Sequence, residues 1–341
     1  MMTSTPRQPL SPTPISGQTM HAIVQREYGT ADTWNLDEIE RPAIGAGQVL
    51  VKVHAAGLDR GTWHLMAGLP YAVRLGFGFR SPKHPVPGRD LAGTVVSVGS
   101  KVTRLKVGDE VFGIGDGAFA EFAVAREDKL AVKPANLSFE SAAAVPISGS
   151  TALRALTDVG RVQAGQRVLV IGASGGVGSY AVQIAAALGA QVTAVCSAAK
   201  SDLVRSLGAS HVLDYARDDF ADGTVSYDLI LDIAGNSPIS RLRRALASRG
   251  TLVIVGGEGR GKLTGGMDRQ LKALAISPFV RQRLTMAVPK EHYSIVERLA
   301  QLIEDGSVVP SVDRTYPLSE AATAMRQLVA GQARGKLVIT I

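Results

Sequence analysis

Cysteine is almost absent from this sequence, which has one, Cys196, among 341 residues. A single thiol excludes an internal disulfide framework and is typical of a reducing compartment, so we expect a cytoplasmic protein. Because Cys196 lies in an apolar run, we expect a buried, unreactive thiol rather than a nucleophile. No apolar stretch is long enough to span a bilayer. No arginine-rich run accompanies the net charge of +7, so we expect no nucleic-acid partner.

What the sequence does contain is a dinucleotide-binding pattern in residues 166–197. An apolar run, Arg167–Ile171, predicts a buried strand, and the glycine-rich turn Gly172–Gly178 follows it. Helical spacing over Tyr180–Leu188 and a second apolar run, Gln191–Cys196, complete a strand–turn–helix–strand unit. Glycines let phosphates approach the backbone, and a helix start offers unpaired N–H groups and a positive dipole end. We therefore expect a dinucleotide whose phosphates bind at Ser174, Gly175, Gly176 and Val177.

The second strand of this unit lacks the acidic residue that usually binds the ribose hydroxyls of NAD. It ends at Cys196 and Ser197, with neither Asp nor Glu. Ser197 can donate a hydrogen bond, and Lys200 can neutralise a 2′-phosphate. Tyr215, at the end of the next predicted strand, His211–Tyr215, can reach the same pocket. The missing acid and the nearby base together favour NADPH over NADH.

The chain divides into regions of different pattern. Residues 1–19 contain four prolines and many serines and threonines, so we expect a disordered tail there. Short strands joined by turns then predict a β-rich domain with non-parallel strands, over 20–25, 48–55, 92–98, 106–113 and 118–125. From about Ser141 strands and helices alternate, which predicts a doubly wound parallel sheet of the α/β class. Its expected elements cover 166–172, 176–189, 191–196, 200–207, 211–215, 227–233, 238–247, 250–256 and 284–288. A helix over 292–304, a helix over 319–329 and a strand over 335–341 follow, and we expect this end of the chain to return to the first domain.

Five motifs make the sequence similar to the medium-chain dehydrogenase/reductase superfamily, and within it to the zinc-independent, quinone-oxidoreductase-like branch. They are Pro87–Gly93, Val107–Gly113, Gly172–Gly178, Leu207–Ala209 and Gly335–Val338. The resemblance covers residues 20–341. It implies a GroES-like catalytic domain formed by residues 20–143 and 291–341, and a Rossmann NADP-binding domain over residues 144–290. It also implies a homodimer joined through the edge strand Leu284–Val288.

The positions that hold zinc ligands in related proteins carry other residues here. Asp59 stands in place of a cysteine, Arg89 in place of a histidine, and Ile147 near the third ligand. A structural zinc lobe would need four cysteines, and the chain has one. Zinc takes about four nitrogen, sulfur or oxygen ligands, so we expect no zinc. We expect an ion pair between Asp59 and Arg89 to fill the vacated position.

Hydride transfer to a conjugated carbonyl leaves negative charge on oxygen, which a hydrogen-bond donor or proton source must stabilise. The resemblance places Tyr71 near a tyrosine of related enoyl-reductase-like proteins; the alternative is an aromatic wall of the pocket. His64 is a second candidate donor, the alternative being a histidine at the edge of the cleft. Asp59 and Arg89 are candidates because they replace former ligands. His54 lies in an apolar strand, and we expect it in the core.

The resemblance implies three more cofactor contacts: Thr151 beside the nicotinamide, Gly256 at the carboxyl edge of the sheet, and Lys336 at the pyrophosphate. Bulky apolar residues gather in 63–79. We therefore expect a hydrophobic small-molecule substrate, such as a quinone or an α,β-unsaturated carbonyl compound.

These expectations combine into a zinc-independent, NADPH-dependent oxidoreductase that reduces quinones or α,β-unsaturated carbonyls by hydride transfer. Two alternatives are open at this point. One is a metal-free, NADP-dependent alcohol dehydrogenase or ketone reductase. The other is a non-catalytic NADPH-binding sensor or partner subunit.

Overall fold

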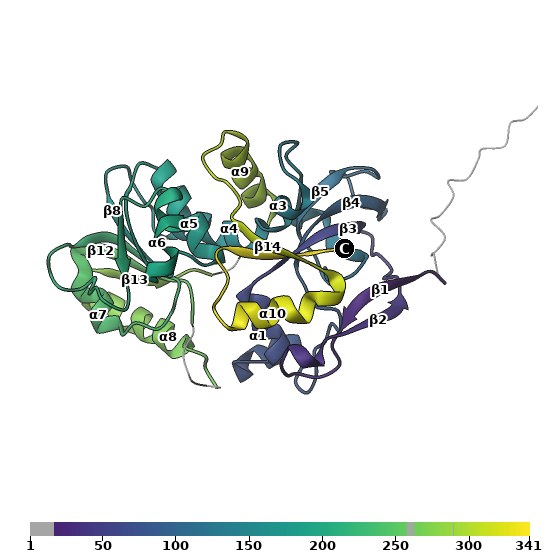
Figure 1. Ribbon diagram of the computed structural model, residues 1–341, viewed down its shortest axis with the longest axis horizontal. Coiled ribbons are helices and arrows are strands. Elements are labelled where there is room, and N and C mark those ends of the chain that lie inside the picture. Colours follow the sequence, from purple (N-terminus) through teal and green to yellow (C-terminus); the bar gives the residue numbers. More distant parts are fainter. Residues whose placement is uncertain (1–16, 258–260, 262, 289) are drawn as a thin grey trace, which may run out of the picture.

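The computed structural model describes residues 17–257, 261, 263–288 and 290–341. Two lobes lie side by side along the longest axis, and the first and last described segments belong to the same lobe (Figure 1). Most of the expected tail, residues 1–16, lies outside the described residues. Strand β1 (Thr19–Val24) begins one residue before Met20. Among the described residues, no helix combines the length and the hydropathy that crossing a bilayer requires.

The first lobe is β-rich, as its turn-separated strands predict. β1 pairs antiparallel with β2 (Asn35–Glu40). A seven-stranded sheet has the order β14-β15-β3-β4-β5-β7, with β6 paired to β3. Its longest strand is β3 (Gln48–Leu58), three residues longer at its end than expected. The other elements of this part of the chain are β4 (Asp90–Val98), β5 (Glu110–Ile114), β6 (Phe122–Arg126), β7 (Leu130–Val132), α1 (Arg60–Ala67), α2 (Arg74–Phe77) and α3 (Phe139–Ala143).

Two strands of this lobe begin later than the sequence predicts. The strand expected from residue 106 begins at Glu110, because Asp109 closes a turn on Lys106 with a backbone bond of 3.2 Å. The strand expected from residue 118 begins at Phe122, although Ala118 and the residues after it are buried. In both segments apolar residues mark burial without marking the strand boundary.

The second lobe contains a six-stranded parallel sheet, which confirms the doubly wound α/β class. Its order is β10-β9-β8-β11-β12-β13. β8 (Arg167–Ile171) lies between β9 (Gln191–Cys196) and β11 (Tyr227–Asp232), so the strand order reverses beside β8. Ligands of such sheets bind at this reversal, beyond the carboxyl ends of the strands. The other elements are β10 (His211–Asp214), β12 (Leu246–Ile254), β13 (Arg283–Met286), α5 (Gly176–Ala187), α6 (Ser201–Ser206), α7 (Ile239–Ala245) and α8 (Met267–Ile276).

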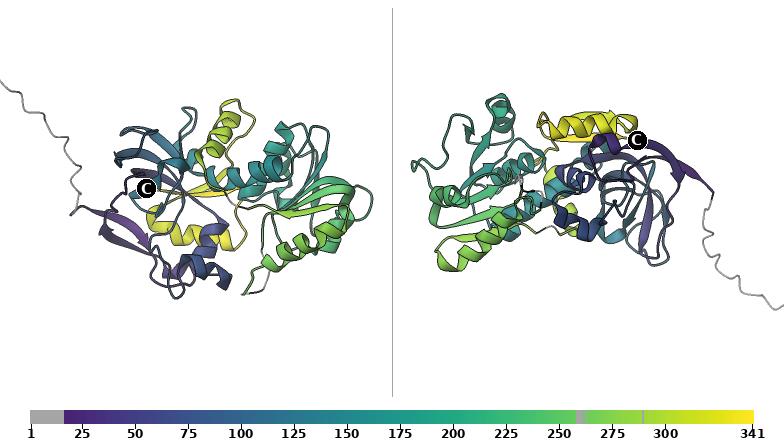
Figure 2. Two further views of the ribbon diagram at one scale, coloured as in Figure 1. Left: turned by 180° about the vertical axis from the view of Figure 1, so that it is seen from behind. Right: turned by 90° about the horizontal axis from the view of Figure 1, so that it is seen from below.

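Helices cover both faces of this sheet (Figure 2). Alternate residues of β8 point to opposite faces, as the two-residue period of a strand requires. Val168 and Val170 belong to the apolar cluster that contains α5, whereas Leu169 and Ile171 belong to the cluster that contains α7. Burial on both faces explains why this strand is a continuous apolar run in the sequence.

The last segment of the chain returns to the first lobe, as expected. α9 (Tyr293–Glu304) leads out of the second lobe, and β14 (Val312–Pro317) and α10 (Ala321–Val329) follow. β15 (Lys336–Thr340) then pairs antiparallel with β3. β14 is mostly exposed and has no apolar alternation, so its sequence gives no strand signal.

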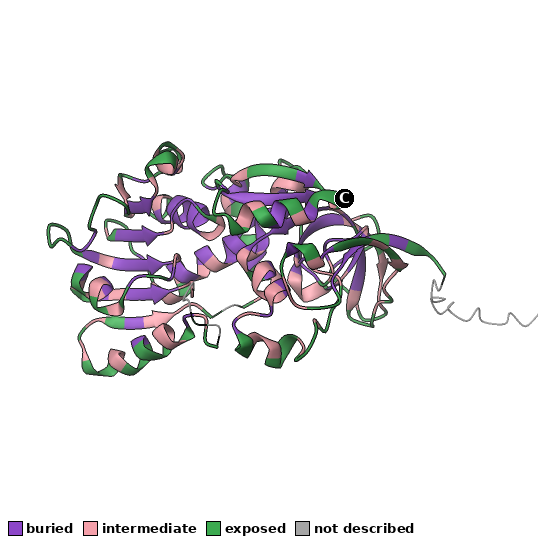
Figure 3. Cartoon of the chain, turned by 60° about the horizontal axis from the view of Figure 1, so that its bottom comes forward, coloured by how far each residue is buried: buried purple, intermediate pink, exposed green. Residues whose placement is uncertain are grey.

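The two lobes share one continuous apolar core. α4 (Pro146–Arg154) lies between them and packs against α5 and α9. The largest buried cluster runs from Ala55 of β3 through α4 to Val168 of β8. Figure 3 shows this buried material passing through the middle of the molecule. The boundary predicted between residues 143 and 144 lies just before α4 and stays a prediction.

Candidate active site

A cavity of about 480 Å³ lies where the two lobes meet. Residues of α1 and α4 line it, together with the residues that follow β11 and β12 at the carboxyl edge of the parallel sheet. This is the place where a doubly wound sheet binds ligands. Most of its lining side chains are apolar, among them Leu65, Val73, Phe77, Ile114, Val177 and Val255.

The glycine turn forms the start of α5 beside this cavity. Gly172 has φ +87°, a conformation that favours glycine, and the chain then enters the helix at Gly176. Gly175 is the N-cap and supplies no side-chain bond. Among the described residues, no acceptor meets the N–H groups of Gly176 and Val177. These groups are therefore free to bind an anion, and Val177 also lines the cavity.

Two glycines of this lobe are required by close backbone contacts. A Cβ at Gly178 would lie 2.1 Å from the carbonyl oxygen of Gly172. A Cβ at Gly256 would lie 1.9 Å from the carbonyl oxygen of Ile233. Any side chain at either position would displace the backbone that borders the cavity. Ser174 is buried beside the turn.

The candidate 2′-phosphate residues meet at the ends of β9 and β10. The Tyr215 N–H donates to the Cys196 carbonyl at 3.1 Å, so Tyr215 lies next to Ser197. Tyr215 is 68% exposed and can close onto a ligand. Lys200 Nζ donates to the carbonyls of Gly331 and Ala333, at 3.1 and 2.6 Å. Partial burial lowers the pKa of Lys200. The three residues thus lie near the same strand ends, while the Lys200 ammonium is bound to carbonyls of the other lobe. Their contact with a 2′-phosphate stays a prediction.

Lys336 takes a different partner from the one expected. Its side chain is 1% exposed, and Nζ lies 2.9 Å from Oδ2 of Asp90, which is fully buried. Asp90 Oδ1 accepts the N–H of Ile147 at 2.8 Å. Burial raises the pKa of Asp90 to about 6, although Lys336 acts in the opposite direction. The ammonium group therefore links β15 to β4 and, through Asp90, to α4. The side chain also passes the glycine turn, where a Cβ at Gly176 would lie 3.1 Å from Lys336 Cδ, and its contact with the pyrophosphate stays a prediction.

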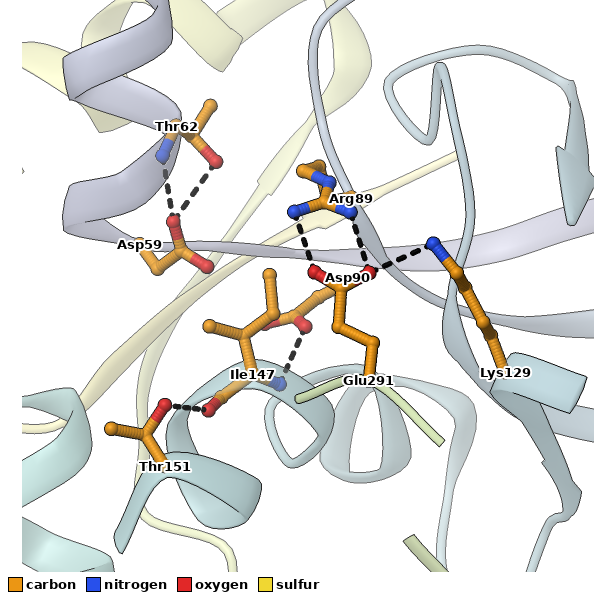
Figure 4. Close-up of polar contacts among 8 residues, drawn as sticks. All are labelled: Asp59, Thr62, Arg89, Asp90, Lys129, Ile147, Thr151 and Glu291. Carbon is orange, nitrogen blue, oxygen red and sulfur yellow. Dashed lines mark hydrogen bonds and ion pairs between the residues drawn. The ribbon is translucent and has the colours of Figure 1, made fainter. Parts of the chain in front are cut away.

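The expected ion pair between Asp59 and Arg89 is not formed. Asp59 is the N-cap of α1, and its Oδ1 accepts the N–H and Oγ1–H of Thr62 at 2.7 and 3.1 Å (Figure 4). Arg89 instead makes two contacts with Glu291, at 2.8 and 2.9 Å. Burial alone would lower the pKa of Arg89, but the bonds with Glu291 raise it. The prediction was wrong because Asp59 caps α1 and Arg89 pairs with Glu291, a carboxylate far away in the sequence.

Glu291 is a site residue that the sequence did not indicate. It also accepts a bond from Lys129 Nζ at 2.8 Å, so two cations share one carboxylate at the cavity wall (Figure 4). Burial would raise the pKa of Glu291, but hydrogen bonds from Arg89 and Lys129 outweigh it and lower the pKa. Glu291 lies 202 residues after Arg89 and belongs to no motif, so only the folded chain brings them together.

The two candidate proton donors, Tyr71 and His64, lie in different places relative to the cavity. Tyr71 is 43% exposed, stacks against Arg74 and is absent from the cavity lining, which contradicts its predicted place at the substrate. His64 does line the cavity, and its Nδ1 lies 2.7 Å from the Leu69 carbonyl oxygen. A carbonyl only accepts, so Nδ1 carries a proton and Nε2 of the neutral ring does not.

The apolar segment 63–79 is divided between cavity and solvent. Leu65, Val73 and Phe77 line the cavity, as the substrate prediction requires. Leu75 and Phe79 are exposed, at 83% and 74%. Leu75 lies in the one-turn helix α2 and Phe79 follows its end, so burial of this segment does not follow its apolar composition.

Comparisons with known proteins agree with this architecture. A model of the alcohol dehydrogenase GroES-like domain matches residues 45–135, and a model named zinc-binding dehydrogenase matches residues 207–339. A chloroplast envelope quinone oxidoreductase homolog of Arabidopsis thaliana is 32% identical, over 95% of this chain and 99% of that protein. This chain belongs to the medium-chain dehydrogenase/reductase superfamily, in its quinone-oxidoreductase-like branch.

Two other members of the superfamily are similar over most of this chain. An NADPH-dependent alkenal/one oxidoreductase of Arabidopsis thaliana chloroplasts is 33% identical, over 94% of this chain and 79% of that protein. The solved structure of the quinone oxidoreductase from Coxiella burnetii superposes with a TM-score of 0.82. It is 27% identical, over 95% of this chain and 100% of the other. The fold and family expected from the sequence are confirmed.

The superfamily's zinc position can now be described in this member. Asp59, Arg89 and Ile147 all line the cavity, so the three replaced positions do converge. In the described part of the chain, no group of three or more His, Cys, Asp or Glu side chains could hold a metal ion. Thr151 also lines the cavity, and its hydroxyl donates to the Ile147 carbonyl at 2.7 Å.

Other expectations concern residues away from the cavity. Cys196 is 3% exposed in β9, as expected of an inert thiol, and burial raises its pKa. His54 is only half-buried, so it is not a full core residue. Its Nε2 lies 3.1 Å from Thr94 Oγ1, and its ring packs on Phe139.

Proposed function

We propose that this protein is an NADPH-dependent oxidoreductase that reduces quinones or α,β-unsaturated carbonyl compounds. One observation carries the proposal: the free N–H groups at the start of α5 open onto a mostly apolar cavity between the lobes. Relatives named quinone oxidoreductase and alkenal/one oxidoreductase support the reaction class. When bound, NADPH supplies a hydride equivalent for the carbon conjugated with the carbonyl group.

The residues around the glycine turn fit such a cofactor. The N–H groups of Gly176 and Val177 would bind the pyrophosphate, helped by the positive end of the α5 dipole. Ser197, Lys200 and Tyr215 would bind the 2′-phosphate, with no carboxylate at the end of β9 to repel it. On the cavity side, Thr151 and Gly256 would border the nicotinamide.

We propose that the reaction needs no zinc. The positions of the zinc ligands carry a helix cap, an arginine and an isoleucine, which do not form a metal-binding set. Arg89 stays charged beside Glu291 and can stabilise negative charge that develops on the substrate oxygen. Water or His64 then supplies the proton. With Nδ1–H bound to the Leu69 carbonyl, only protonated His64 could donate from Nε2.

The test is NADPH consumption by the purified protein, with NADH in parallel. The substrates are a quinone, an enone and a saturated ketone, each assayed before and after exhaustive metal chelation. We expect oxidation of NADPH with the quinone or the enone, faster than with NADH and unchanged by chelation.

Each other result points to a different function. Turnover of the ketone alone would favour an alcohol dehydrogenase. Loss of activity on chelation would overturn the zinc-free proposal. Tight NADPH binding without turnover of any substrate would contradict the proposed reaction and favour a sensor or partner subunit.

We also propose that the protein is a cytoplasmic homodimer. β13 is an edge strand, paired only with β12 among the described strands, so its other side can extend the sheet into a second copy. Mass measured by light scattering should be twice that of the chain. A mass of one chain at every concentration would overturn this proposal.

A further inference from the structure

Two buried polar atoms of the cavity wall have no hydrogen-bond partner. They are Oδ2 of Asp59 and Oγ of Ser150, and no other described residue meets either atom. The two side chains are 8% and 7% exposed, and both residues line the same cavity. Buried polar groups are almost always hydrogen-bonded, because leaving them unpaired is costly. The orphaned pair therefore points to a ligand that enters the cavity.

The surrounding structure explains why Asp59 Oδ2 is left over. Capping of α1 uses the other oxygen, Oδ1, which accepts both bonds from Thr62. Arg89 is close enough for the Asp59 charge to raise its pKa, yet both of its terminal nitrogens face Glu291. Figure 4 shows Asp59 with one oxygen toward Thr62 and the other unbonded. The cap fixes the carboxylate, so Oδ2 cannot rotate away to find another partner.

Ser150 is the second residue with an unpaired atom in the cavity lining, one helical position before Thr151. It lies in α4, whose start is fixed by the bond from the Ile147 N–H to buried Asp90. Serine hydroxyls within helices often bond to a carbonyl one turn earlier, as Thr151 does here. Ser150 Oγ makes no such bond. Its capacity to donate and to accept is therefore unused, at a residue that lines the cavity.

A carboxylate oxygen accepts hydrogen bonds and cannot donate them. The group that satisfies Asp59 Oδ2 must therefore be a donor, and the remaining lining is mostly apolar. We propose that Asp59 and Ser150 form a subsite for a hydroxyl group, so that the enzyme selects enone or quinone substrates that carry a hydroxyl substituent. This inference rests on the proposed reductase function and specifies its substrate class.

Such a subsite discriminates strongly for a physical reason. A substrate without the hydroxyl leaves the buried oxygen unpaired, whereas a hydroxylated one exchanges its bond to water for a bond to a charged acceptor. A methyl ether is worse still, because its oxygen also only accepts and would face the carboxylate. We expect hydroxylated substrates to exceed their methyl ethers in kcat/KM by about 10-fold or more.

The experiment compares enones in matched sets of three: a hydroxyl compound, its methyl ether and the analogue with hydrogen at that carbon. From one set to the next, the substituent stands at a different carbon of the enone. kcat/KM with NADPH is measured for the wild-type protein and for Asp59→Asn. Asparagine can cap α1 through its carbonyl oxygen while placing an NH2 donor where Oδ2 stood. The polarity of the subsite is thereby inverted at nearly constant shape.

We expect the wild type to prefer the hydroxyl compound in at least one set. In Asp59→Asn that preference should fall by about 10-fold or more, and the methyl ether should gain relative to the hydrogen analogue. Ser150→Ala should weaken the preference less, because Asp59 still accepts the bond. Asp128→Asn, a surface change outside the cavity, is the matched control and should leave every ratio unchanged.

The outcomes distinguish this inference from the proposed function. Wild-type turnover without preference for hydroxyl in any set would overturn the subsite and leave the reductase function intact. A preference that Asp59→Asn does not change would likewise overturn it. No NADPH consumption with any enone or quinone would contradict the proposed function itself. Thermal unfolding of each variant shows whether a loss reflects folding rather than recognition.

Discussion

The two lobes hold their site residues by different means. In the second lobe, the groups that we propose to bind the phosphates are backbone N–H groups of one continuous segment, 172–178, fixed by glycine contacts within that segment. On the facing wall, Asp90 and Arg89 depend on Lys336 and Glu291, which lie 246 and 202 residues away. The geometry of the glycine turn is therefore set by neighbouring residues. The positions of Asp90 and Arg89 depend instead on residues that only the whole fold brings close.

The largest expected effect is a loss of stability when the buried ion pair between Asp90 and Lys336 is broken. Asp90→Ala should lower the free energy of unfolding by about 3–5 kcal/mol, because it leaves the Lys336 ammonium and the Ile147 N–H buried without an acceptor. Thermal or urea unfolding measures the loss. The double variant Asp90→Ala with Lys336→Met should recover part of it. Equal stability of Asp90→Ala and the wild type would show that these buried bonds do not stabilise the fold.

The same pair should make stability depend on pH. Folding raises the pKa of Asp90 from 3.8 to about 6, so the folded protein binds a proton more tightly than the unfolded chain. Protonation of Asp90 therefore stabilises the fold fully below about pH 4. This stabilisation is lost as the pH rises through 6, and the free energy of unfolding falls by up to about 3 kcal/mol. Urea unfolding at pH 4, 5, 6 and 7, compared with the double variant, isolates this contribution. If the stabilisation by Asp90 increased from pH 4 to 7, this prediction would be contradicted.

A smaller effect is expected in the second lobe, at Lys200. Lys200→Ala should weaken NADPH relative to NADH by about 10- to 100-fold in KM, because a charge-assisted contact with the 2′-phosphate is lost. KM for both cofactors is measured with the same quinone. Lys106→Ala, on the surface of the other lobe, is the control. An equal loss for both cofactors would show that Lys200 only joins the lobes through Gly331 and Ala333.

The smallest effect is expected at Tyr71. Tyr71→Phe should change kcat for enone reduction by less than about 2-fold, because its ring is half-exposed and outside the cavity lining. His64→Gln, by contrast, should lower kcat if protonated His64 donates the proton. A loss of more than 10-fold in Tyr71→Phe would mean that the segment closes over the substrate and restores the predicted role.

Sequence patterns predicted most elements of the second lobe, although no expected element covers α8. β9 has the bounds that its apolar run gives, and α5 begins at Gly176, where its expected range begins. These elements are encoded locally, by burial of a strand on both faces and by helical spacing of apolar residues. The β-rich lobe was predicted less well, because exposed strands such as β14 carry no apolar alternation.

The sequence by itself determined the glycine turn and the order of strands and helices along the parallel sheet. Both depend on residue types at short spacing, where chain geometry leaves few arrangements. The sequence also shows which residues stand at the positions that hold zinc ligands in related proteins. Only the tertiary structure decided that Arg89 pairs with Glu291, that Lys336 pairs with Asp90, that Tyr71 faces solvent and that Asp59 Oδ2 has no partner. The reason is physical: the partner of a charge depends on distances through space, which the fold sets and neighbouring residues in the sequence do not.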